Sequence, residues 1–163
     1  MRNNIKYSRF GFILLFLFSV AFGTVSCQDD FDPGQTAVAQ MSGKWYVREY
    51  VKSGNSYSPA SSSNYFKIRT FNTSKNSEKE MYIDDIDGGV FDLHILFVNY
   101  GDLFFKSVDG EAGDVFEKGY VYPQMGRSKT GVVTDSIYFE LTSGSTTKIY
   151  GGHMYTGFLD DMY

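Results

Sequence analysis

Two histidines are the only side chains of this 163-residue chain that ordinarily change charge near neutral pH, so they are the candidate general bases. His94 follows Asp92 by two residues, and in a strand both side chains would share a face, where the carboxylate could orient the imidazole. His153 lies among tyrosines near the end of the sequence. The stretch "TSGSTTK" comes closest to a nucleophilic serine motif, but it lacks the trailing glycine of Gly-x-Ser-x-Gly. We therefore expect no catalytic residue.

The segment "DDIDGG" has the residue types of a calcium-binding loop. Asp85, Asp87 and Gly88 would occupy the third, fifth and sixth positions of that loop. Its first and twelfth positions would then fall on Ile83 and His94, where the ion requires oxygen ligands. We therefore expect an ordinary turn between two strands at this place, with no metal and no cofactor.

Cys27 is the only cysteine, so no disulfide can form within the chain. It follows a basic start and an uncharged apolar stretch from Phe10 to Gly23, which is shorter than the about 20 residues that a spanning helix needs. This order of basic, apolar and small residues is typical of a secretory leader. We predict a signal peptide over residues 1–26, cleaved before Cys27. A membrane anchor helix that stays uncut is the alternative.

The sequence "TVSC" resembles the lipobox of bacterial lipoproteins, in which the cysteine after the cleavage site is acylated. The resemblance implies that Cys27 carries acyl chains and holds the protein on its membrane, because several chains together give a stable anchor. Asp29, Asp30 and Asp32 follow, and an acidic stretch at this place resembles the surface-export signal of lipoproteins from some anaerobic Gram-negative bacteria. We therefore expect a lipid-anchored outer-membrane protein, exposed at the cell surface.

The charge of the chain argues against nucleic acid as a partner. Loss of the leader would remove three basic residues and no acidic one, so the remaining chain would be more acidic than the net charge of −4 of the whole sequence. An acidic surface repels phosphate backbones. We expect no nucleic-acid binding.

After a tether predicted for residues 27–42, the chain alternates apolar and polar residues, with Trp45 on one face of the first segment and Tyr46 on the other. Alternation indicates strands because successive side chains point to opposite faces. Turn-forming stretches such as "KSGNS", "NTSKNS" and "VDGEAGD" separate the segments. We predict one all-β domain over residues 43–163 with about eight strands: 44–52, 64–71, 79–85, 90–98, 102–108, 114–122, 131–142 and 147–158.

The pattern is compatible with an antiparallel up-and-down barrel or a β-sandwich. Aromatic residues make up 18% of the sequence, which favours the barrel, because a small closed barrel needs large side chains to fill or line its interior. Every second residue would line a cavity for one small apolar ligand. The candidate ligand-binding residues are Trp45, Val47, Phe66, Ile68, Ile83, Phe91, Ile95, Ile137 and Phe139. The opposite faces, with Tyr46, Tyr50, Tyr82 and Tyr138, would make a more polar pocket if they turned inward.

The tripeptide Gly43-Lys44-Trp45 resembles the Gly-x-Trp motif of lipocalins and other calycins, in which the tryptophan closes one end of an eight-stranded barrel. A short helical turn expected at Thr36–Met41 suits that position. The stretches "TDSIYFEL" and "KIYGGHMYTGFLDDMY" are similar to a family of small bacterial lipoproteins with lipocalin-like barrels, sometimes labelled lipid-binding putative hydrolases. The arginine that covers the tryptophan in lipocalins has no counterpart, because the last basic residue is Lys148.

The resemblance and the strand pattern together predict an outer-membrane lipoprotein that binds a small hydrophobic or amphipathic, lipid-like ligand in the barrel cavity. The alternative is a filled barrel that serves as an interaction or structural module of a surface complex, with an outer-membrane protein as partner. A hydrolase that uses His94 or His153 as its base is the third hypothesis.

Overall fold

The computed structural model describes residues 36–108 and 113–163. The predicted leader, Cys27 and most of the predicted tether lie outside the described residues. Within the described ranges, no helix is long and apolar enough to cross a bilayer. Strands are the only long regular elements of the described residues, which also contain three short 3₁₀ turns at Ala39–Met41, Tyr100–Asp102 and Leu159–Asp161.

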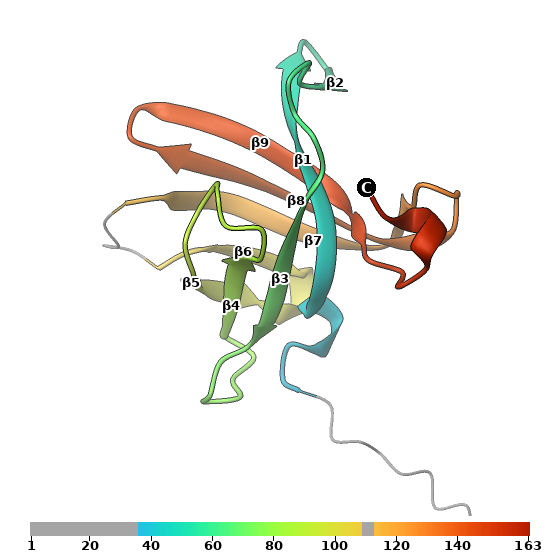
Figure 1. Cartoon of the computed structure of the whole chain (residues 1–163). Helices are drawn as coiled ribbons and strands as arrows, with labels where there is room; N and C mark the ends of the chain where they lie inside the picture. Colours follow the sequence, from blue (N-terminus) through green and yellow to red (C-terminus); the bar gives the residue numbers. More distant parts are fainter. Residues whose placement is uncertain (1–35, 109–112) are drawn as a thin grey trace, which may run out of the picture. The chain divides into compact units, whose positions relative to one another are not determined.

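The strands form one antiparallel sheet that closes on itself (Figure 1). Neighbours along the sheet follow the order β2-β1-β3-β4-β5-β6-β7-β8-β9, and β1 also pairs with β9, so eight strands make a closed barrel. The barrel prediction is thereby confirmed over the sandwich. The strands are β1 Gly43–Ser53, β2 Ser56–Pro59, β3 Phe66–Asn72, β4 Glu80–Asp85, β5 His94–Asn99, β6 Phe104–Ser107, β7 Val115–Arg127, β8 Val133–Ser143 and β9 Thr146–Met154.

The ninth strand, β2, was not predicted. It forms a hairpin with the last residues of β1, from Tyr50 to Ser53, while the first part of β1 pairs with β3. Its four residues are all exposed, so no burial imposes an alternating pattern on the sequence "SYSP". The hairpin extends beyond the barrel wall (Figure 1).

The barrel interior is occupied by its own side chains. Inward-facing residues of the strands form a single core with residues outside the strands, and the largest fully buried side chains belong to Trp45, Phe105, Phe116 and Phe139. Gly119 on β7 faces inward and leaves room for the Phe105 ring, because a Cβ there would lie 2.2 Å from that ring. Placing a large side chain opposite a glycine in this way lets a small barrel reach the packing density of a normal protein core.

Trp45 closes the end of the barrel at which β1 begins. Its indole N–H donates to the Thr70 hydroxyl at 2.8 Å, and that hydroxyl donates to the Met41 carbonyl at 2.5 Å. Val38 and Met41 are fully buried beside it, so the short turn before β1 belongs to the core. Met154 on β9 lies directly opposite Trp45 in the register and packs against the core.

The loop from β4 to β5 closes the other end, and Asp85 organises it. The Asp85 carboxylate accepts four backbone N–H groups, from residues 87 to 90, at 2.9–3.0 Å. This loop carries Phe91 over the core, where its ring packs edge-on against Phe116 and Phe139. The predicted turn in "DDIDGG" is thus a loop tied to one carboxylate, and no group of three metal-binding side chains occurs in the described ranges.

Replacing Asp85 by alanine is expected to lower the free energy of unfolding by about 2–3 kcal/mol. The four N–H groups would lose a charged acceptor, and a single hydrogen bond to a charged group contributes about 1.5–3 kcal/mol. Urea unfolding followed by the fluorescence of Trp45, the only tryptophan, measures the change. Replacing the exposed Asp87, whose contacts are on the surface, is the control and should change stability by no more than about 1 kcal/mol.

The prediction that Ile95 faces the barrel interior is wrong, whereas Phe91 is buried in the core. Strand β5 begins only at His94, and its inward residues are Leu96 and Val98, which are fully buried. Ile95 and Phe97 point outward, with 38% and 40% of their surfaces exposed. Because apolar residues stand on both faces here, the sequence pattern has no polar side to mark the outside.

Candidate functional site

Most of the nine predicted ligand-binding residues lie in the packed core rather than around an open space. Phe66 is partly buried against that core, and Ile95 lies outside the barrel. The other seven are buried core residues: Trp45, Val47, Ile68, Ile83, Phe91, Ile137 and Phe139. Their role in ligand binding stays a prediction.

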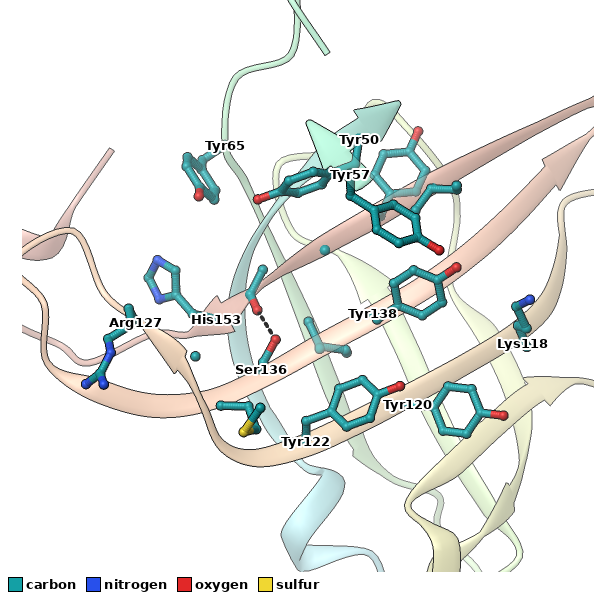
Figure 2. A pocket seen from close by; sticks show the side chains of 17 residues that line it. Tyr50, Tyr57, Tyr65, Lys118, Tyr120, Tyr122, Arg127, Ser136, Tyr138 and His153 are labelled. Carbon is teal, nitrogen blue, oxygen red and sulfur yellow. Dashed lines mark hydrogen bonds between the residues drawn. The ribbon is translucent and has the colours of Figure 1, made fainter. Parts of the chain in front are cut away.

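A groove on the outer surface of the barrel offers the space that the interior lacks. It has a volume of about 720 Å³ and runs over β7, β8, β9 and the β1–β2 hairpin (Figure 2). We call it the tyrosine groove, after six of the seven tyrosines that line it: Tyr50, Tyr57, Tyr65, Tyr120, Tyr122 and Tyr138. The seventh, Tyr150, is buried in the barrel core. Figure 2 shows Tyr120, Tyr122 and Tyr138 along one side and Tyr50, Tyr57 and Tyr65 along the other.

The strand register explains why the tyrosines gather on this face. Tyr120 and Tyr122 are two residues apart on β7, so both point outward, and Tyr120 is paired directly with Tyr138 on β8. Gly151 on β9 is in turn the partner of Tyr138, so the floor between the two rows carries no side chain there. The two rows meet where Tyr57 packs edge-on against Tyr138, with ring centroids 6.3 Å apart, and the bare strand at Gly151 leaves a channel beside this contact.

A charged hydrogen-bond network lies at one end of the groove. Lys118 forms an ion pair with Glu140 at 3.0 Å, and the Tyr138 hydroxyl donates to the same carboxylate at 2.5 Å. Burial and this hydrogen bond raise the pKa of Tyr138. Burial alone would raise the pKa of Glu140, but the hydrogen bonds from Tyr138 and Lys118 outweigh it and lower that pKa. The charge of Lys118 is therefore largely compensated.

His153 lies at the opposite end of the groove, next to Arg127 (Figure 2). The histidine is almost fully buried; its Nδ1 lies 3.1 Å from the Met154 carbonyl and its Nε2 lies 3.2 Å from the Tyr163 hydroxyl. A carbonyl can only accept, so Nδ1 carries a proton, and in the neutral imidazole Nε2 then accepts from the Tyr163 hydroxyl. Burial, and then contacts with Tyr65, raise the pKa of Tyr163 to about 12.

The segment that follows β9 is fastened beside this end by Asp161. Its carboxylate accepts from the Thr130 N–H at 2.8 Å and from the Thr130 and Thr156 hydroxyls at 2.6 Å. Burial alone would raise the pKa of Asp161, but these hydrogen bonds outweigh it and hold the pKa below its ordinary value. Asp161 thereby keeps Tyr163 in contact with His153.

The arrangement does not resemble a nucleophile with its base. Ser136 is the direct partner of His153 across β8 and β9, but its hydroxyl donates to the Gly152 carbonyl at 2.9 Å, as the dashed line in Figure 2 shows. His153 is engaged by Tyr163 instead. His94 lies far along the barrel, against the ring of Phe116. What the groove can do with these groups is bind: ring faces, hydroxyls and a few charged groups surround an open channel.

Fold and groove together define a class: a small, filled, closed β-barrel with an aromatic binding surface on its outer wall. The comparison with known families agrees with the fold. The model of the family described as lipid-binding putative hydrolase matches residues 30–159, and the chain belongs to this family. Among curated proteins, none matches the chain. The predicted lipocalin-like, lipid-binding class is thereby confirmed at the level of the family.

Proposed function

We propose that the protein is an outer-membrane lipoprotein that binds an amphipathic, lipid-like ligand in the tyrosine groove. The observation that carries the proposal is the groove itself, because an open channel of about 720 Å³ lined by six amphipathic side chains lies on a barrel of a lipid-binding family. Tyrosine combines an apolar ring with a polar hydroxyl, so it suits a ligand that has both kinds of surface.

The groove is a better candidate than the barrel interior. A ligand inside the barrel would have to displace side chains such as Phe105, Phe116 and Phe139, which have no exposed surface. Removing a buried aromatic side chain from its contacts costs about 3–5 kcal/mol, as large-to-small substitutions show. The groove is open before any ligand arrives, and binding there leaves the core intact.

The location of the protein is part of the proposal. Cys27 after a lipobox-like sequence would supply the acyl anchor, and the aspartates behind it support export to the cell surface. A Cys27→Ser variant expressed in the native host should leave the membrane fraction. Metabolic labelling with a palmitate analogue should label the wild type alone, and equal labelling of both proteins would refute the anchor.

Native mass spectrometry of the protein purified from its own membranes tests the ligand. We expect a co-purified amphiphile on the wild type and its loss from a Tyr122→Ala and Tyr138→Ala double variant. A matched control is Tyr82→Ala, which removes an outward tyrosine from β4, where its ring packs on the neighbouring Phe71. If the double variant keeps the ligand while the core variant Ile137→Val loses it, the ligand lies in the interior and the groove proposal is wrong.

An interaction module remains the second candidate, favoured by exposed apolar side chains beyond the groove. They lie around the contact between the β7–β8 turn and the last 3₁₀ turn. In this contact Lys129 donates to the Met162 carbonyl and the Thr130 N–H donates to the Asp161 carboxylate. The exposed residues are Val132, Phe158, Leu159 and Met162. Cross-linking on intact cells should capture an outer-membrane protein through Leu159 if this candidate is correct, and should capture none if the protein acts alone.

A further inference from the structure

We infer that the tyrosine groove recognises a saccharide, carried either as the headgroup of a lipid or as a free oligosaccharide. The inference rests on the proposed function in that the groove is taken as the ligand site. It adds the chemical class of the part of the ligand that the groove holds. The argument depends on the ring faces, the hydroxyl groups, the scarcity of aliphatic side chains and the compensated charge.

The ring faces form a platform of the kind that a sugar ring can lie on. Tyr120 and Tyr122 are nearly parallel, with an interplanar angle of 23° and ring centroids 5.8 Å apart. Figure 2 shows the faces of these two rings and of Tyr138 turned toward the viewer. One face of a pyranose presents C–H groups, and the negative face of an aromatic ring attracts such weakly positive hydrogens.

The hydroxyls around the platform provide the second half of sugar recognition. Burial raises the pKa values of Tyr50, Tyr122 and Tyr138, so their hydroxyls stay protonated. The Tyr138 hydroxyl donates its proton to Glu140 and can only accept from a ligand, whereas that of Tyr122 can donate and accept. Glu140 adds an acceptor at one end of the row, and Ser136 adds a hydroxyl on the floor. A saccharide has hydroxyls of the same two-sided character around its ring edge, so it can satisfy these groups when water leaves.

An alkyl chain suits the groove less well. The aliphatic side chains that line it are those of Ile149 and Met125, against six tyrosine hydroxyls, because the Ile137 side chain is fully buried in the core. A chain laid over these hydroxyls would strip their water and offer no hydrogen bond in return, which is unfavourable for every group left unpaired. The buried core of this same protein, with its aliphatic and phenylalanine side chains, shows the composition that an apolar environment has.

A phosphate or carboxylate is also a poor match for the row of rings. Two cations line the groove: Lys118 lies beside the rings, where the ion pair with Glu140 at 3.0 Å compensates its charge, and Arg127 lies at the opposite end, away from the row of rings. An anion placed on the platform would meet the negative ring faces and the Glu140 carboxylate together. A neutral, hydroxyl-rich ring meets neither obstacle.

Two sets of probes test the inference on the full-length protein held in nanodiscs. The first is an array of immobilised oligosaccharides of glucose, mannose, galactose and N-acetylglucosamine. The second compares dodecyl maltoside, maltose and dodecylphosphocholine by calorimetry below the micelle concentrations of the two detergents. The variants are Tyr122→Ala, which removes a ring, Tyr122→Phe, which keeps the ring, and Tyr82→Ala, which removes a ring outside the groove.

We expect at least one saccharide of either set to bind the wild type, and Tyr122→Ala to weaken it about five- to tenfold, since one aromatic contact of this kind contributes that much. Tyr122→Phe and Tyr82→Ala should stay within about threefold of the wild type. Binding of free sugar as tightly as dodecyl maltoside would identify a glycan as the source, whereas binding of the alkyl glycoside alone would identify a lipid headgroup.

The remaining outcomes separate this inference from the proposed function. If dodecylphosphocholine binds as tightly as dodecyl maltoside and Tyr122→Ala weakens both, the groove holds a lipid without a sugar and the inference is wrong. If sugars bind and a dodecyl chain adds nothing, the inference stands and the lipid part of the proposed function fails. If no saccharide on the array or in solution binds better to the wild type than to Tyr122→Ala, the inference is overturned.

Discussion

Replacing Gly152 by alanine is expected to prevent the barrel from closing. A Cβ at this position would lie 1.9 Å from the backbone oxygen of Tyr46 and 2.8 Å from the Cα of Val47, so two backbones would have to separate. Both atoms belong to β1, the strand that closes the sheet against β9. Overpacking of a core usually costs about 1–3 kcal/mol when side chains can move, and backbone atoms cannot move away so easily. We expect a larger loss, with little folded protein.

The neighbouring glycine is the matched control for this prediction. A Cβ on Gly151 would lie 3.4 Å from the ring of Tyr50, which is an ordinary contact, and would point into the tyrosine groove. Gly151→Ala should therefore fold, with a melting temperature close to that of the wild type. Circular dichroism and the fluorescence of Trp45 distinguish the two variants. Equal melting temperatures for Gly152→Ala and the wild type would show that β1 and β9 do not meet as described.

Replacing Phe139 by alanine should lower the free energy of unfolding by about 3–5 kcal/mol, the usual cost of removing a buried phenylalanine. The ring is fully buried, stacks on Tyr150 at 5.1 Å and packs against Phe116 at 5.5 Å. The adjacent Tyr138 points to the other side of the wall. Its replacement by alanine removes one hydrogen bond to Glu140 and should lower stability by about 1 kcal/mol.

Urea unfolding measures both changes, and ligand binding should show the opposite order. Tyr138→Ala is expected to weaken binding in the groove, whereas a milder core variant, Phe139→Leu, should bind normally once it is folded. Tyr138 and Phe139 are adjacent in the chain but point to opposite faces of the strand, because strand side chains alternate between faces. The two variants therefore test ligand binding and stability separately. If Phe139→Leu weakened binding while Tyr138→Ala did not, the ligand would lie in the barrel interior.

The sequence was informative about the strands because most of them have one polar face. Residues 44–52 and 135–141 alternate cleanly, and both lie in observed strands whose inward residues are the predicted ones. The pattern failed for β5, where Ile95 and Phe97 on the outside are as apolar as Leu96 and Val98 on the inside. It also failed for β2, which buries nothing and therefore carries no periodic signal.

The groove could not be predicted from the sequence for a different reason. Its tyrosines are spread along the sequence between positions 50 and 138. Only the pairing of β1 with β9 and of β9 with β8 brings them to one surface. Such long-range pairings are not encoded in any local pattern. Two local signals were available: the outward tyrosines Tyr120 and Tyr122 two residues apart, and the adjacent glycines 151 and 152 in a predicted strand. Together they indicate a ring platform beside a bare strand.

The pairing of β1 with β9 makes the groove a late product of synthesis. Its floor is built from the strand that the ribosome adds last among the nine, laid against the strand that it adds first. A nascent or truncated chain without β9 has no floor to offer, so a ligand of the groove could bind only the finished chain. Conversely, such a ligand would favour the closed form by RT ln(1 + [L]/Kd), which would couple its binding to resistance against proteolysis.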